Sequence, residues 1–120
     1  MARRALIVDD SASMRELVSM TLSRNGYQVV EATNGKEALI QLGAGFDVII
    51  TDLNMPVMDG ITFIKEVRAK PAFKYTPVLL LTTEVRTEQK EKARAAGATG
   101  WLNKPFDPNA LLGVLKKVLP

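Results

Sequence analysis

The 120-residue sequence contains neither cysteine nor histidine. The absence of cysteine excludes disulfide bonds and thiolate chemistry. The absence of histidine excludes histidine general-base catalysis, and without either residue the common transition-metal sites are also excluded. Any chemistry at this chain must therefore use carboxylates, hydroxyls, amides and cationic side chains.

Long apolar runs and dense runs of one charge are missing as well. Only Ala5–Val8 separates the basic start of the chain from Asp9, which is too short for a signal peptide, and no stretch reaches membrane-spanning length. The net charge is +3, with basic residues spread from Arg3 to Lys117, so we expect no nucleic-acid or membrane partner and a cytoplasmic location. The length predicts a single domain over residues 1–120.

Short β-branched and aliphatic runs alternate with segments of helical periodicity. Helix starts are indicated by a capping box at Ser13–Glu16, by Asn34 and by the Asp107-Pro108 pair. The expected strands are residues 5–8, 27–32, 46–52, 78–81 and 99–103, and a helix follows each of them.

The fourth of these helices, over residues 87–96, has almost no large apolar side chain. It is therefore expected to be the least firmly attached element. The expected inward faces of the five helices are, in chain order, Met14, Leu17, Val18, Thr21 and Leu22; Ala38, Leu39 and Leu42; Ile61, Ile64 and Val67; Ala93, Ala95 and Ala96; and Leu111, Leu112, Leu115, Val118 and Leu119.

Five strand–helix units predict an α/β fold, in which right-handed crossovers build a doubly wound, flavodoxin-like (βα)5 parallel sheet covered on both faces. Ligands of such sheets bind beyond the carboxyl ends of the strands. Asp9, Asp10, Asp52, Thr82 and Lys104 all follow expected strands and should therefore meet at this edge. A single aspartate in such a place is usually a turn or cap residue, but four strand ends that agree indicate a site.

Three adjacent carboxylates repel one another unless a cation neutralises them. Ligands that are all oxygen suit a hard ion, and Mg²⁺ fits best. Lys104 adds a positive charge and Thr82 a hydroxyl donor, so the set describes a carboxylate that accepts a phosphoryl group. With no histidine, the chain cannot be its own phosphohistidine donor.

Two other functions remain open at this point. A flavin or nucleotide binder would share the fold class, although no glycine-rich phosphate loop follows the first strand. A metal-dependent phosphohydrolase could also use aspartates at strand ends. Such an enzyme normally has an acid–base carboxylate two positions after the nucleophile, and that position here is Asn54.

The motifs together resemble the receiver domain of bacterial two-component response regulators over essentially all 120 residues. Within that family the chain is similar to the stand-alone chemotaxis regulators, as Ser13-Met14-Arg15 also indicates. The resemblance implies the strand order 2-1-3-4-5, no output domain and no enzyme activity beyond the chain's own phosphorylation and dephosphorylation. The motifs are Asp9-Asp10, Asp52 ahead of Met55-Pro56 and Met58-Asp59-Gly60, Thr82 after an apolar strand, and Lys104-Pro105-Phe106.

The same resemblance implies a role for each residue at the strand ends. Asp52 is expected to be the phosphoacceptor. Asp10, Asp52 and the backbone carbonyl of Asn54 are expected to bind Mg²⁺ directly, and Asp9 largely through coordinated water. Lys104 is expected to pair with the phosphate, and the Lys104-Pro105 peptide bond to be cis.

A switch and its partners are implied too. Thr82 and Trp101 match the hydroxyl and the aromatic position of the family's switch, where the aromatic is usually Tyr or Phe. Asn54 and Glu84 match the positions that tune dephosphorylation. The implied partners of this monomer are a histidine kinase as phosphodonor and a downstream protein that binds the face formed by the fourth helix, fifth strand and fifth helix.

Overall fold

The five expected strands pair in parallel in the computed structural model, which describes residues 2–119. They are β1 Arg4–Val8, β2 Gln28–Ala32, β3 Val48–Thr51, β4 Val78–Thr82 and β5 Gly100–Asn103. The sheet order is β2-β1-β3-β4-β5, which confirms the implied order. Because β2 lies on one side of β1 and β3 on the other, the strand order reverses between β1 and β3, where ligands of such sheets bind.

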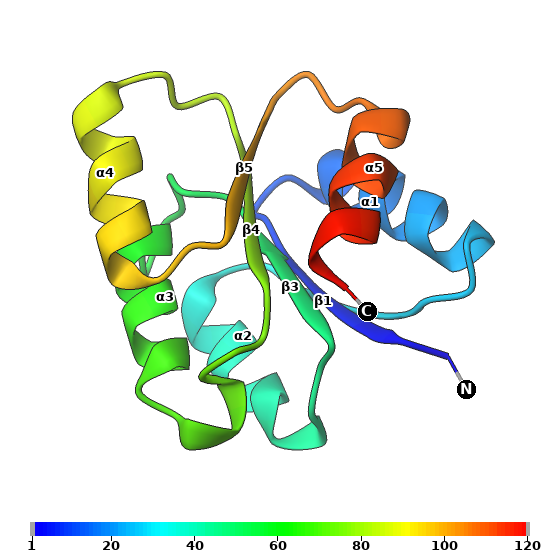
Figure 1. Ribbon diagram of the computed structural model, residues 1–120, viewed down its shortest axis with the longest axis horizontal. Coiled ribbons are helices and arrows are strands. Elements are labelled where there is room, and N and C mark those ends of the chain that lie inside the picture. Colours follow the sequence, from blue (N-terminus) through cyan, green and yellow to red (C-terminus); the bar gives the residue numbers. More distant parts are fainter. Residues whose placement is uncertain (1, 120) are drawn as a thin grey trace.

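Five helices cover both faces of this sheet. They are α1 Ala12–Arg24, α2 Gly35–Gln41, α3 Gly60–Arg68, α4 Thr87–Ala96 and α5 Pro108–Val118, with short 3₁₀ turns at Leu42–Ala44 and Pro71–Phe73. Figure 1 shows α1 and α5 on one face and α2, α3 and α4 on the other. This arrangement confirms the doubly wound α/β class. None of the helices among the described residues is long and apolar enough to cross a membrane.

The central strands are apolar on both faces because both faces are covered. Leu6 and Val8 of β1 belong to the core under α2, α3 and α4, whereas Ala5 and Ile7 belong to the core under α1 and α5. All four are at most 2% exposed. The sequence thus leaves polar side chains only at the strand ends, and this places the aspartates after β1 and β3 at the edge of the sheet.

The predicted start of α1 was wrong by two residues. The N-cap is Ser11 rather than Ser13, and its hydroxyl accepts a hydrogen bond from the Met14 amide at 3.3 Å. The Asp9 carboxylate explains the difference, because it accepts a hydrogen bond from the Ser11 amide at 2.9 Å and fixes the chain there. The predicted caps Asn34 and Asp107 are confirmed.

Three helix faces also differ from expectation. On α3 the fully buried Phe63 was not predicted, and Ile61 is only partly buried. On α1 the buried residues are Val18 and Leu22, while Leu17 is 50% exposed at the edge of the stripe. On α4 only Ala93 is buried and Ala95 is exposed. These errors arise because periodicity identifies a face but not how much of its width the sheet covers. Strands β2 and β5 begin one residue later than expected, at Gln28 and Gly100, and β3 begins two residues later, at Val48.

Candidate functional site

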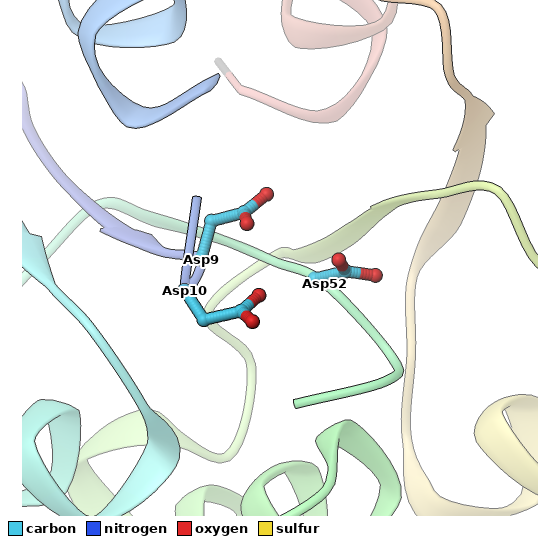
Figure 2. A group of neighbouring side chains, drawn as sticks. All are labelled: Asp9, Asp10 and Asp52. Atoms are coloured by element: carbon cyan, nitrogen blue, oxygen red, sulfur yellow. The ribbon is translucent and has the colours of Figure 1, made fainter. Parts of the chain in front are cut away.

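Three carboxylates gather at the carboxyl ends of β1 and β3. Asp9 and Asp10 follow β1, Asp52 follows β3, and one oxygen from each lies within 4.8 Å of the others. In Figure 2 the Asp9 and Asp10 side chains extend toward the side on which Asp52 lies. Asp9 and Asp52 are buried, whereas Asp10 is exposed and forms no hydrogen bond or ion pair with another described residue. The structure therefore brings together the three predicted acidic residues.

Lys104, which follows β5, joins two of these carboxylates. Its Nζ donates to Asp9 Oδ2 at 2.8 Å and to Asp52 Oδ2 at 2.9 Å. Burial by itself would lower the pKa of Lys104, but the hydrogen bonds to Asp9 and Asp52 outweigh burial and raise this pKa above its ordinary value. The Lys104-Pro105 peptide bond is cis, as the resemblance implied.

The other carboxylate oxygens of Asp9 and Asp52 accept hydrogen bonds from backbone amides. Asp9 Oδ1 accepts from the Ser11 amide at 2.9 Å, and Asp52 Oδ1 accepts from the Leu53 amide at 2.6 Å. One ammonium among three carboxylates leaves an excess of negative charge. An all-oxygen donor set with this excess fits a hard divalent cation such as Mg²⁺.

The loop after Asp52 packs tightly against the start of α3. A Cβ added at Gly60 would lie 2.5 Å from the Asp52 carbonyl oxygen and 2.7 Å from Leu53 Cα, so only glycine fits there. The Gly60 amide donates to the Leu53 carbonyl at 2.7 Å. Within the loop, Val57 is a non-glycine residue with a φ of 70°. Asn54 is exposed on this loop, and its carbonyl as a metal ligand stays a prediction.

Thr82 and Glu84 lie at the end of β4. Thr82 is fully buried, and its hydroxyl accepts a hydrogen bond from the Glu84 amide at 3.2 Å. The Glu84 carboxylate is also buried and is held by the Arg86 guanidinium at 2.6 and 2.9 Å. Arg86 is the main reason why the pKa of Glu84 falls to about 2.

Trp101 in β5 is half-buried beside α4. Its indole Nε1 donates to Asn103 Oδ1 at 3.2 Å, and the ring lies 5.0 Å from the Lys90 ammonium of α4. The ring lines a surface groove of about 400 Å³ between α4 and β5. Thr82 and Trp101, the two predicted switch residues, thus lie on the neighbouring strands β4 and β5, on the side of the sheet where the lightly anchored α4 packs.

Sequence reasoning missed two cations of this region, Arg86 and Lys90. Arg86 stands two residues after Glu84, and that spacing was the only available signal for the pair. No sequence pattern predicts the contact between Lys90 and Trp101, because it depends on how α4 packs beside β5.

The fold and the strand-end residues define a receiver-type protein, and comparison with known sequences agrees. The chain belongs to the response regulator receiver domain family, whose sequence model matches residues 5–116. This assignment favours the receiver interpretation over the flavin-binder and phosphohydrolase alternatives.

Within that family the chain is closely related to CheY chemotaxis regulators. It is 44% identical to the chemotaxis protein CheY1 of Helicobacter pylori strain J99, over 97% of this chain and 96% of that protein. It is 39% identical to a CheY homolog of Campylobacter jejuni, over 97% of this chain and 92% of that protein. The crystal structure of CheY4 of Vibrio cholerae has a TM-score of 0.95 and 51% identity, and the match covers 99% of this chain and all of that chain.

Proposed function

We propose that this chain is a single-domain response regulator that accepts a phosphoryl group on Asp52 from a histidine kinase, and that it acts in chemotaxis in the cytoplasm. The observation that carries the proposal is the Lys104 ammonium, held between the buried carboxylates of Asp9 and Asp52 beside the exposed Asp10. A role in chemotaxis is supported by the similarity of this chain to chemotaxis proteins.

Transfer requires a nucleophile, and Asp52 is proposed for this role. A carboxylate oxygen of Asp52 attacks phosphorus in line, a P–O bond forms, and the P–N bond to the kinase histidine breaks, leaving the electron pair on the histidine nitrogen. Lys104 then pairs with a phosphoryl oxygen in place of its present contact with Asp52. The chain thus acts as its own catalyst, as a signalling protein and not as an enzyme for a separate substrate.

The acidic cluster would hold Mg²⁺ through Asp10, Asp52 and the Asn54 carbonyl, with Asp9 acting through water. When bound, Mg²⁺ would supply positive charge that offsets the negative charge of the carboxylates and the phosphoryl oxygens. Asp9 also keeps Lys104 oriented, since their ion pair is 2.8 Å long.

The output is proposed to run through Thr82 and Trp101. Thr82 turns its hydroxyl toward the new phosphate, which opens space for the Trp101 ring to move inward and changes the face formed by α4, β5 and α5. A downstream protein binds this face of the monomer. Asn54 and Glu84 are proposed to orient the water that later removes the phosphate.

Incubation with Mg²⁺ and acetyl phosphate tests the proposal. Intact mass should show the gain of one phosphoryl group in the wild type and none in Asp52→Asn. The matched control is Asp107→Asn, which replaces the N-cap of α5 with an equally good cap and should be phosphorylated normally. Phosphorylation of Asp52→Asn to the wild-type level would contradict the assignment of Asp52.

The identity of the phosphodonor needs a separate experiment. The purified protein should accept phosphate from at least one member of a panel of phosphorylated histidine kinases from its own organism. Transfer from none of them, with acetyl phosphate still effective, would contradict the kinase partner while leaving Asp52 as phosphoacceptor.

A further inference from the structure

Both oxygens of the Glu84 carboxylate accept hydrogen bonds from local donors. Oε1 accepts from Arg86 Nη2 at 2.6 Å. Oε2 accepts from Arg86 Nε at 2.9 Å, from the Val85 amide at 3.1 Å and from the Arg86 amide at 3.2 Å. All four hydrogen bonds come from the two residues directly before α4, so the carboxylate is tied to the start of that helix.

The two partners differ in exposure. The Glu84 side chain is 7% exposed, whereas the Arg86 side chain is 60% exposed. Arg86 therefore covers a buried carboxylate from the solvent side. A two-point fork between a guanidinium and a carboxylate also fixes orientation, because both groups are planar.

The following inference rests on the proposal above that Glu84 helps to orient the water that removes the phosphate. The contacts of Glu84 in this structure do not leave it free to do so. A carboxylate that orients an attacking water must offer it a lone pair in the right direction. The two-point contact with Arg86 fixes the carboxylate at the start of α4, so Glu84 has to leave this fork before it can turn toward a water beside Asp52. The fork thus competes with dephosphorylation.

We propose that Arg86 is a positioning residue that keeps the Glu84 carboxylate at the start of α4 and thereby lengthens the lifetime of the phosphorylated state. The Glu84 amide also donates to the Thr82 hydroxyl, at 3.2 Å. Movement of Thr82 toward a phosphate breaks this bond and loosens the loop, so Glu84 is freed more readily once Asp52 is phosphorylated. Arg86 sets how strongly that release is opposed.

The decay of the phosphorylated protein tests this inference. The protein is phosphorylated with acetyl phosphate and Mg²⁺, the donor is removed, and the remaining phosphorylated fraction is followed by intact mass. Arg86→Ala should decay about two- to fivefold faster than the wild type, the range expected for a half-exposed ion pair. Arg86→Lys keeps the charge but not the fork and should fall between them. The control Arg24→Ala, at the exposed end of α1, should match the wild type.

A double variant separates positioning from simple loosening of the loop. In a Glu84→Gln background, Arg86→Ala should leave the decay rate unchanged, because the group through which Arg86 acts is missing. The inference is overturned if Arg86→Ala alone decays at the wild-type rate or more slowly, or if it accelerates decay equally in the Glu84→Gln background. Absence of any phosphorylated wild-type protein before the decay begins would instead overturn the proposed function, and this inference with it.

Discussion

Helices α3 and α4 cover the same face of the sheet but are anchored very differently. On α3 the residues Phe63, Ile64 and Val67 are fully buried, whereas α4 buries only Ala93. Complete burial of a large apolar side chain contributes about 1.5–3 kcal/mol, so α3 is held by several times the apolar contact energy that holds α4.

The difference corresponds to the two tasks proposed for the site, phosphorylation and readout. Helix α3 begins directly after the Asp52 loop, where Gly60 allows close packing, and its firm anchoring keeps the acidic cluster in place. Helix α4 follows Thr82 and Glu84. Its C-terminal end is linked to Arg68 of α3, which donates to the Gly97 carbonyl at 2.8 and 3.1 Å. The proposed phosphorylation site thus adjoins a firmly anchored helix, and the proposed readout uses a weakly anchored one.

The largest expected effect comes from breaking the anchor of α3. Phe63→Ala removes a fully buried ring and should lower the free energy of unfolding by about 3–5 kcal/mol. Ala93→Gly on α4 should cost only about 1 kcal/mol, mainly through helix propensity. Urea unfolding measures both. Equal losses would show that α4 is anchored as firmly as α3.

Mg²⁺ binding tests the acidic cluster that lies next to the firmly anchored α3. At ten times its dissociation constant it should raise the free energy of unfolding by about 1.4 kcal/mol. In chelator, Asp10→Asn should melt higher than the wild type, because Asp10 repels its neighbours and has no partner among the described residues. Asp52→Asn should not, since it loses its contact with Lys104. A lower melting temperature for Asp10→Asn would contradict this account of the cluster.

The fluorescence of Trp101, the only tryptophan in the sequence, tests the region of β5 beside the weakly anchored α4. Acetyl phosphate with Mg²⁺ should reduce quenching of its fluorescence by an added solute, and Asp52→Asn should abolish the change. Lys90→Met removes a cation–π contact of about 0.5–1 kcal/mol that holds the Trp101 ring in its present position. The decrease in quenching should therefore occur at a lower phosphodonor concentration than in the wild type. Full phosphorylation with unchanged quenching would show that α4 carries the signal without Trp101.

The smallest effect concerns the link between β4 and α4. The hydrogen bond from Arg86 is the main cause that lowers the pKa of Glu84 from 4.5 to about 2. A carboxyl group with a lowered pKa stabilises the fold above its unfolded pKa, and this stabilisation is lost as the pH falls toward the folded value. The difference in melting temperature between wild type and Glu84→Gln should therefore be constant above about pH 5 and shrink from about pH 4.5 to 2.

The matched control for this measurement is Glu66→Gln, which makes the same substitution at an exposed position of α3. A Glu84→Gln difference that persists unchanged down to pH 2 would mean that Arg86 does not hold the carboxylate in its ionised form.

The sequence alone was sufficient wherever the signal is local. The apolar runs and the caps at Asn34 and Asp107 fixed most elements to within a residue or two, because strand burial and helix capping depend on neighbours in the chain. The start of α1 was misplaced because Asp9, a site residue, binds the Ser11 amide and competes with the local capping signal at Ser13. The resemblance supplied the strand order and the residue roles, and the order is confirmed.

By itself, then, the sequence determined the α/β class and the meeting of Asp9, Asp10, Asp52, Thr82 and Lys104 at one edge, since parallel strands carry their carboxyl ends to the same side. Only the tertiary structure decided that Lys104 bridges Asp9 and Asp52, and that Lys90 lies over Trp101. The physical reason is that the contacting residues are far apart in the chain. These contacts join side chains from different elements, and their geometry depends on how the elements pack, which periodicity and composition do not encode.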